Sequence, residues 1–341
     1  MLAVAAVAAA AAAAWTGVLL SQDPTNPTSP SGVGDAASDA PLTTLAGATT
    51  PIPSVADAAG ASMVALRAVT DHGTVDLVGV AVAEGGQVAT TADQLSGLES
   101  IDMVGQGGKL RHASVVAIDH RSDIALVSVP DDVPVPRFSD DDRLTNGSAD
   151  LTLTTASAAN GAVTLRCTPG TITGIGAAIA SGPAAGMPSI TSSALSVSEG
   201  SGDLLLNSSG EVLGIYYGGA ATATTTTTSA LAPTFLPTEL VVGVADDLRS
   251  SGQVTQGWLG IAGSDAVGQP GADVATVTPG SPAAGHLHSG DVIAELNSIP
   301  VRSMADLRGR LYVLTPSTSV SLSIQHGSSD QVVDVTLGAS P

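Results

Sequence analysis

The stretch Glu199–Ile215, which reads EGSGDLLLNSSGEVLGI, decides the fold expected for this chain. It places Ser201 in a loop of small residues and follows that loop with apolar runs typical of strands. Two earlier stretches each hold an aspartate, Asp93 and Asp123. A nucleophilic serine needs a base within hydrogen-bond reach and a third group that orients the base. Asp93, Asp123 and Ser201 are therefore the candidate catalytic residues.

The region around these residues has the pattern of a β protein. From Val75 to about Tyr217, short apolar runs alternate with turns, which favours a barrel or a sandwich. Aromatic residues make up only 2% of the chain, so Val, Ile, Leu and Ala must form the core. The turns that punctuate the pattern are Glu84-Gly85-Gly86, Gly105-Gln106-Gly107-Gly108 and Asn160-Gly161. No internal repeat is evident.

The segment Ile190–Ile215 resembles, in register and without gaps, the nucleophile loop and following strand of the trypsin-like HtrA family of serine proteases. Phe235-Leu236-Pro237 resembles the barrel exit of the same family. The resemblance covers most of residues 54–339 and implies two β-barrels with the active site between them. It assigns Ser201 as the nucleophile and Asp123 as the orienting acid.

Asp93 stands where the family pattern has the catalytic histidine. An aspartate with an ordinary pKa of about 3.9 is too weak a base to deprotonate serine near neutral pH. Removing a triad histidine typically lowers turnover by a factor on the order of 10⁶. We therefore expect that ordinary triad proteolysis is lost, and that Asp123 and Ser201 remain as structural residues.

The loop that should form the oxyanion hole, Glu199, Gly200 and Ser201, also departs from the family pattern. Glu199 and Gly200 replace a glycine and an asparagine, while Asp203 and Leu204 replace a glycine and a proline. Two carboxylates beside Ser201 oppose the negative charge that an oxyanion hole must stabilise.

An active serine endopeptidase with a rearranged site is the alternative hypothesis. His120, three residues before Asp123, is a conceivable replacement base, although its position predicts a turn between strands. A further alternative is that the protein regulates an active relative through mixed assembly.

The segment Gly257–Gly338 resembles the PDZ domain that follows the protease domain in the HtrA family. Its motifs are Gly257–Ile261, Pro279–Ala284 and Ser289–Ile293, followed by a helix-like Met304–Leu311 and a strand Val320–Ile324. The resemblance implies that a glycine-rich loop captures a terminal carboxylate and that a strand edge accepts an extended peptide. The predicted peptide-binding residues are Trp258, Leu259, Gly260 and Ile261, and the predicted partners are protein C-termini or unfolded polypeptides.

The N-terminal run Leu2–Leu20 is uncharged and would span roughly 28 Å as a helix, close to the thickness of a bilayer core of about 30 Å. We predict a membrane helix at 1–20, with a cleaved signal peptide as the alternative. The Ser/Thr/Pro-rich residues 21–51 then form a flexible linker. A protease-like domain at 52–245 and a PDZ domain at 255–341 complete the predicted organisation, with the folded domains outside the cytoplasm.

The chain has a formal net charge of −20, with 11 Lys+Arg against 31 Asp+Glu. Nucleic acid is excluded as a partner because phosphate binding needs clustered basic residues, and Lys109 is the sole lysine. The single cysteine, Cys167, cannot form an intramolecular disulfide, and no ligand cluster predicts a metal or other cofactor. Assembly into homo- or hetero-oligomers is left open.

Three local assignments also follow from periodicity. Val55–Leu66 has helical spacing, but its second half, Met63–Val69, fits a strand equally well. Glu239–Leu248 is a predicted helix, whereas residues 218–231, with five consecutive threonines, are a predicted surface loop.

Overall fold

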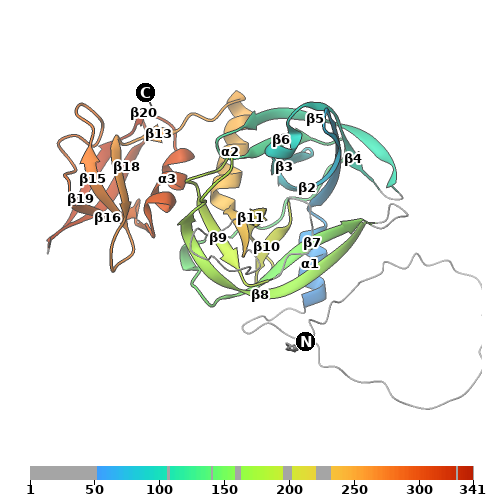
Figure 1. Cartoon of the computed structure of the whole chain (residues 1–341), viewed down its shortest axis with the longest axis horizontal. Helices are drawn as coiled ribbons and strands as arrows, with labels where there is room; N and C mark the ends of the chain where they lie inside the picture. The colour runs from blue at the N-terminus through green and yellow to red at the C-terminus, as the bar shows by residue number, and fades with distance from the viewer. Residues whose placement is uncertain are drawn as a thin grey trace, which may run out of the picture.

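The computed structural model describes residues 52–105, 108–139, 141–157, 163–194, 202–219, 232–327 and 329–340. Two β-barrels lie beside each other, a long helix runs along both, and a smaller β-rich unit follows at the C-terminal end (Figure 1). This arrangement confirms the predicted class, mainly β with a double barrel followed by a second β-rich unit.

The predicted membrane helix at 1–20, the linker at 21–51 and the threonine run all lie outside the described residues. Within the described part of the chain, no helix is long and apolar enough to cross a membrane.

The first barrel is a closed sheet whose strands pair in the order β1-β2-β3-β6-β5-β4. Burial alternates residue by residue along β1, as expected when one face of a strand points into a core. The strand bounds are β1 Met63–Thr70, β2 Gly73–Ala83, β3 Gln87–Thr91, β4 Leu98–Val104, β5 Leu110–Asp119 and β6 Ile124–Ser128, with a 3-10 turn η1 at Asp93–Leu95.

The second barrel repeats this topology, because its strands pair in the order β7-β8-β9-β12-β11-β10. The sequence shows no repeat, since a shared strand order constrains only the alternation of apolar residues and not their identity. The strand bounds are β7 Ala149–Ser157, β8 Val163–Ala178, β9 Pro188–Ser192, β10 Leu204–Asn207, β11 Val212–Gly219 and β12 Pro233–Pro237, with a 3-10 turn η3 at Asp141–Arg143 before the barrel.

Helix α2, Thr238–Ser251, joins the two barrels through one shared apolar core (Figure 1). Leu126 of the first barrel, Leu204 of the second and Val244 of α2 are fully buried members of this core. The helix ends at Gly252, whose φ of 75° is the left-handed conformation common at helix C-termini. The helix predicted from the spacing of Glu239–Leu248 is confirmed and is slightly longer than predicted.

The structure resolves the ambiguity at the start of the folded region. Helix α1 covers Ile52–Gly60, and strand β1 begins at Met63. The prediction of one helix through Leu66 is therefore wrong, and the alternative of a strand over Met63–Val69 is correct. Pairing of β1 with both β2 and β4 decides the outcome, since periodicity over so few residues does not.

The C-terminal unit, here called the distal unit, is a sheet with the strand order β14-β15-β16-β18-β19, which leaves β14 and β19 at its edges. The predicted helix at Met304–Leu311 and the strand at Val320–Ile324 are confirmed. The bounds are β13 Gly257–Trp258, β14 Ile261–Asp265, β15 Ala272–Val277, β16 Asp291–Leu296, β17 Ile299–Pro300, α3 Met304–Tyr312, β18 Ser319–His326, β19 Ser329–Thr336 and β20 Gly338–Ala339.

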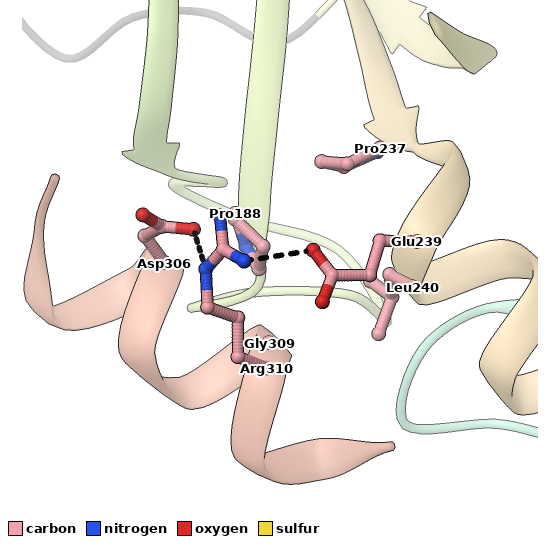
Figure 2. Close-up of a pocket in the computed structure, with 7 residues that line it drawn as sticks. All are labelled: Pro188, Pro237, Glu239, Leu240, Asp306, Gly309 and Arg310. Carbon is pink, nitrogen blue, oxygen red and sulfur yellow. Dashed lines mark hydrogen bonds and ion pairs between the residues drawn. The ribbon is translucent and has the colours of Figure 1, made fainter. Parts of the chain in front are cut away.

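Helix α3 attaches the distal unit to the barrels through a buried arginine. The guanidinium of Arg310 lies 3.1 Å from Asp306 of the same helix, 3.1 Å from Glu239 of α2 and 3.3 Å from Asp142. Figure 2 shows Arg310 reaching from α3 between Asp306 and Glu239, beside a cavity of only about 10 Å³. A buried cation with three carboxylates is strongly destabilised if its partners are removed, so this contact fixes the junction.

We predict that Leu126→Ala lowers the free energy of unfolding by about 2–5 kcal/mol, because the removed side chain is fully buried in the core shared by the barrels. Chemical denaturation monitored by circular dichroism measures the change. The matched control is Leu110→Ala, which removes the same atoms from a side chain that is 45% exposed and should cost less than about 1 kcal/mol. Equal losses in both variants would contradict the shared core.

Candidate functional site

Pairing between strands β3 and β6 brings Asp93 and Asp123 together. Thr91 is the partner of Ile124 in this antiparallel pair, so the residues just after β3 meet the residues just before β6. The backbone N–H of Asp93 donates to Oδ1 of Asp123 at 2.6 Å, and that of Ala92 donates to the carbonyl of Asp123 at 3.0 Å. The structure therefore places the two aspartates next to each other.

Asp123 occupies a constrained and buried position. Asp123 is only 3% exposed, and its φ of 59° lies in the left-handed region that a non-glycine residue rarely adopts. Such a conformation costs about 1–3 kcal/mol and persists only where the surroundings enforce it. Asp93, by contrast, is exposed in the 3-10 turn η1.

The pKa of Asp123 is raised to about 6, mainly by burial; the backbone hydrogen bond from Asp93 opposes this rise, and the nearby charge of Asp93 contributes to it. His120 also lowers the pKa of Asp123 slightly, so the imidazole lies within electrostatic range of this carboxylate. His120 is exposed in the turn between β5 and β6, as its sequence position predicts. The site as described is therefore a carboxylate pair with a histidine at its margin.

Ser201, Glu199 and Gly200 lie outside the described residues, so their predicted roles stay predictions. The chain is described again from Gly202, which has a φ of 107°. A Cβ on Gly202 would lie 1.9 Å from the carbonyl oxygen of Val78 in β2, so only glycine fits between the barrels here. Asp203 follows and is fully buried, and its charge adds to burial in raising the pKa of Tyr216.

Tyr217 of β11 is a site residue that the sequence did not reveal. Burial raises its pKa, and the charges of Asp123 and Asp93 add to that rise, which places the phenol near the carboxylate pair. Its hydroxyl oxygen accepts a hydrogen bond from the backbone N–H of Ala184 at 3.2 Å. A tyrosine on a barrel strand has no distinguishing local pattern, so only packing between the barrels could identify it.

A second unpredicted residue, Tyr312 of α3, connects the distal unit to the turn that carries Asp123. Its hydroxyl donates to Oδ2 of Asp119 at 2.7 Å. The same oxygen accepts from the backbone N–H and the hydroxyl of Ser122, the residue before Asp123. The guanidinium of Arg121 lies 5.8 Å from the centre of the Tyr312 ring. Contacts from α3 therefore help to hold this turn in place.

The four predicted peptide-binding residues form the entry to the edge strand β14. Leu259 is 1% exposed and lies in the core of the distal unit, so only its backbone can meet a ligand. Gly260 has a φ of 83°, and its carbonyl accepts from the backbone N–H of Thr278 at 2.8 Å. Trp258 is half-buried beside this turn, and Ile261 begins the strand. The loop thus has a fixed backbone next to an exposed strand edge.

The asparagine-serine turn of the distal unit keeps the geometry that a glycine would normally supply. Asn297 and Ser298 have φ values of 52° and 65°, so both adopt the left-handed conformation. The side chain of Asn297 accepts a hydrogen bond from the backbone N–H of Ser321 at 2.9 Å, which offsets the free-energy cost of the left-handed conformation.

In the part of the chain that the structure describes, no group of three or more His, Cys, Asp or Glu residues is arranged to hold a metal ion.

Comparisons with known proteins agree with this architecture. Residues 78–215 match the trypsin-like peptidase domain family, and residues 257–337 match the PDZ domain family. Over 242 residues, the chain is 30% identical to a probable periplasmic serine endoprotease, DegP-like, from Pseudomonas fulva, an alignment that covers 67% of this chain and 48% of the relative. It is 28% identical to the periplasmic pH-dependent serine endoprotease DegQ from Escherichia coli, over 75% of this chain and 57% of the relative.

The chain belongs to the HtrA-like protease family. It spans about half the length of the curated relatives that it matches. The solved structure of the HtrA-type protease AlgW with a tripeptide has a similar fold, with a TM-score of 0.59 at 20% identity over 85% of this chain and 98% of that one. That likeness concerns the fold alone.

In this HtrA-like chain, the described part of the candidate site holds two carboxylates. The turn before β6 keeps Asp123 in place, while Asp93 adds a second carboxylate beside it. Because the two carboxylates repel one another, ionisation of both is less favourable in the folded state than in the unfolded chain. This arrangement predicts a specific dependence of stability on pH.

We predict that Asp123→Asn makes the protein more stable at pH 8 by up to about 3 kcal/mol and changes its stability little at pH 4. The folded pKa of about 6 exceeds the unfolded value of 3.8, so the destabilisation from Asp123 is absent below pH 4, develops between pH 4 and 6, and is complete above pH 6. Denaturation midpoints across this range measure the effect.

The Asp123→Asn variant keeps part of the dependence of stability on pH, because burial also raises the pKa of Asp150 to about 6. The exposed Glu99→Gln serves as the control and should leave the pH profile unchanged. An Asp123→Asn profile that runs parallel to the parent would show that this carboxylate is not destabilised by its surroundings.

Proposed function

We propose that the protein is a non-catalytic HtrA-like homologue that binds protein C-termini or unfolded polypeptides and acts as a scaffold or regulator in protein quality control outside the cytoplasm. In this proposal a double-barrel domain at 52–245 and a PDZ domain at 255–341 are linked through 21–51 to a single membrane helix at 1–20.

The observation that carries the loss of catalysis is the contact between Asp93 and Asp123. A triad needs a neutral base that the orienting carboxylate can hold by a hydrogen bond and that can take the serine proton. Asp93 presents an N–H of its backbone to Asp123 at 2.6 Å, and its side chain is an exposed acid. Proton transfer from serine to such a carboxylate is strongly unfavourable near neutral pH.

The binding part of the proposal rests on the distal unit. Strand β14 is an edge strand, and four of its five residues are exposed. A main-chain edge beside a glycine turn allows an extended peptide to add as a further strand with its terminal carboxylate at the turn. The related AlgW structures were solved with a tripeptide and a decapeptide, which supports peptide binding as the role of this fold.

The cellular setting of the proposal comes from relatives and from charge. The matched relatives are named as periplasmic proteins, which supports placing the folded domains outside the cytoplasm. A net charge of −20 supports protein partners and opposes nucleic acid. Mixed assembly with an active relative is a regulatory route compatible with this setting.

A serine-directed fluorophosphonate probe and casein hydrolysis test the catalytic part of the proposal on the full chain. We expect no labelling of the parent and a turnover lower by a factor on the order of 10⁶ than that of an active family member such as DegQ, run in parallel. Labelling of the parent that disappears in Ser201→Ala would overturn the proposal and establish the alternative, an active endopeptidase with a rearranged site.

Two further variants make the result specific. Asp93→His restores the missing residue type, and activity regained only in this variant would show that Glu199 and Asp203 are tolerated. His120→Ala tests the one histidine near Asp123, since any residual activity that depends on His120 would identify it as the replacement base.

A further inference from the structure

The space between strand β14 and helix α3 is bounded by identifiable residues at both ends. It begins at Gly260 and Ile261, where the edge strand starts. At the other end, Oδ1 of Asp265 accepts a hydrogen bond from the backbone N–H of Met304, the first residue of α3, at 2.8 Å. The terminal methyl of Met304 lies 2.8 Å from the point where a Cβ on Gly263 would stand. The space along this edge of β14, beside α3, is here called the groove, and the proposed peptide would add there.

Strand geometry sets the spacing of the side chains along a peptide that adds to β14. Side chains alternate along β14, and Gly263 and Asp265 pair with the fully buried Val274 and Ala272, so they share the face that α3 covers. If the terminal residue of an antiparallel peptide lies beside Ile261, the residue two positions before the terminal residue lies beside Gly263. The residue four positions before the terminal residue lies beside Asp265, because each step along either strand is about 3.3 Å.

The position at Gly263 favours an apolar side chain. Gly263 has no side chain of its own and cannot gain one, since its Cβ would lie 1.8 Å from the carbonyl oxygen of Asp273. Met304 lies across this point, and its flexible, polarisable thioether adapts to apolar groups of different shapes.

The position at Asp265 favours a basic side chain. Asp265 is exposed, so its carboxylate can accept from a ligand in addition to the N–H of Met304. Asp273 lies directly opposite Ser264 on the neighbouring strand, so its side chain is on the other face of the sheet. Asp265 is therefore the carboxylate that meets a basic side chain at this position.

The three arginines of the distal unit do not offset this negative charge, because all three lie toward the second barrel. Arg310 is buried among carboxylates at the junction, and Arg308 donates to the carbonyl of Gly186 at 3.2 Å. The Cβ of Arg302 is 3.3 Å from where a Cβ on Gly176 would stand. Attachment of α3 to the barrels thus leaves the groove side of the distal unit with acidic groups.

We propose that this groove selects chain ends that carry an apolar residue two positions before the terminal residue and an arginine or lysine four positions before it, with Met304 and Asp265 as the selecting residues. This selectivity rests on the proposed peptide-binding function and goes beyond it by naming the class of peptide.

The test measures dissociation constants by fluorescence anisotropy, using the full chain and fluorescein-labelled decapeptides ending in Arg-Ser-Val-Ser-Val. A second peptide has glutamate in place of the arginine, a third has aspartate in place of the middle valine, and a fourth has a C-terminal amide. We expect the arginine peptide to bind about tenfold more tightly than the glutamate peptide at low ionic strength, and about twofold at 1 M salt, where the Debye length is about 3 Å. The aspartate peptide should bind at least about tenfold more weakly.

Asp265→Asn should reduce the preference for arginine over glutamate about three- to fivefold, since an amide oxygen still accepts from Met304 but carries no charge. The matched control, Asp330→Asn, removes an exposed carboxylate from the opposite edge strand β19 and should keep the preference. Equal binding of the arginine and glutamate peptides, with the amide peptide failing to bind, would overturn the selectivity and leave peptide binding intact. If no peptide binds, the proposed peptide-binding function fails and the selectivity fails with it.

Discussion

Burial of aliphatic side chains in one core shared by both barrels and helix α2 is the interaction on which the rest of this structure depends. With aromatic residues at 2% of the chain, the core is built from Leu, Ile, Val, Ala and Met, with few larger groups. Each Leu, Ile, Val or Met side chain contributes about 1.5–3 kcal/mol when removed from water. Because residues from both barrels belong to the same core, the barrels hold a fixed position relative to one another.

The candidate site depends on strand pairing rather than on the identity of one side chain. The pairing of β3 with β6 holds the backbone of Asp93 against Asp123, and this pairing does not require an imidazole. Asp123 keeps a structural task, since it accepts a backbone hydrogen bond in a conformation that few residues tolerate.

Helix α3 has two faces with separate tasks. One face carries Arg310, which pairs with Glu239 of α2 (Figure 2). Tyr312 at the end of the helix holds the turn before Asp123 through Asp119. The groove face presents Met304 to the edge strand β14. A single short helix thus joins the domains and lines the proposed peptide groove, and the same attachment places the arginines of the distal unit on the barrel side.

The sequence by itself determined the fold class and the order of the two units, because each depends on local periodicity or on a motif that is contiguous in the chain. The helix at Glu239–Leu248 belongs to the same category. Only the tertiary structure decided that Met63 starts a strand, that Asp203 is buried, that Tyr312 holds the turn before Asp123, and that the three arginines of the distal unit all reach residues outside that unit. These features arise from contacts between residues far apart in the sequence, and burial at such contacts leaves no periodic signal along the chain.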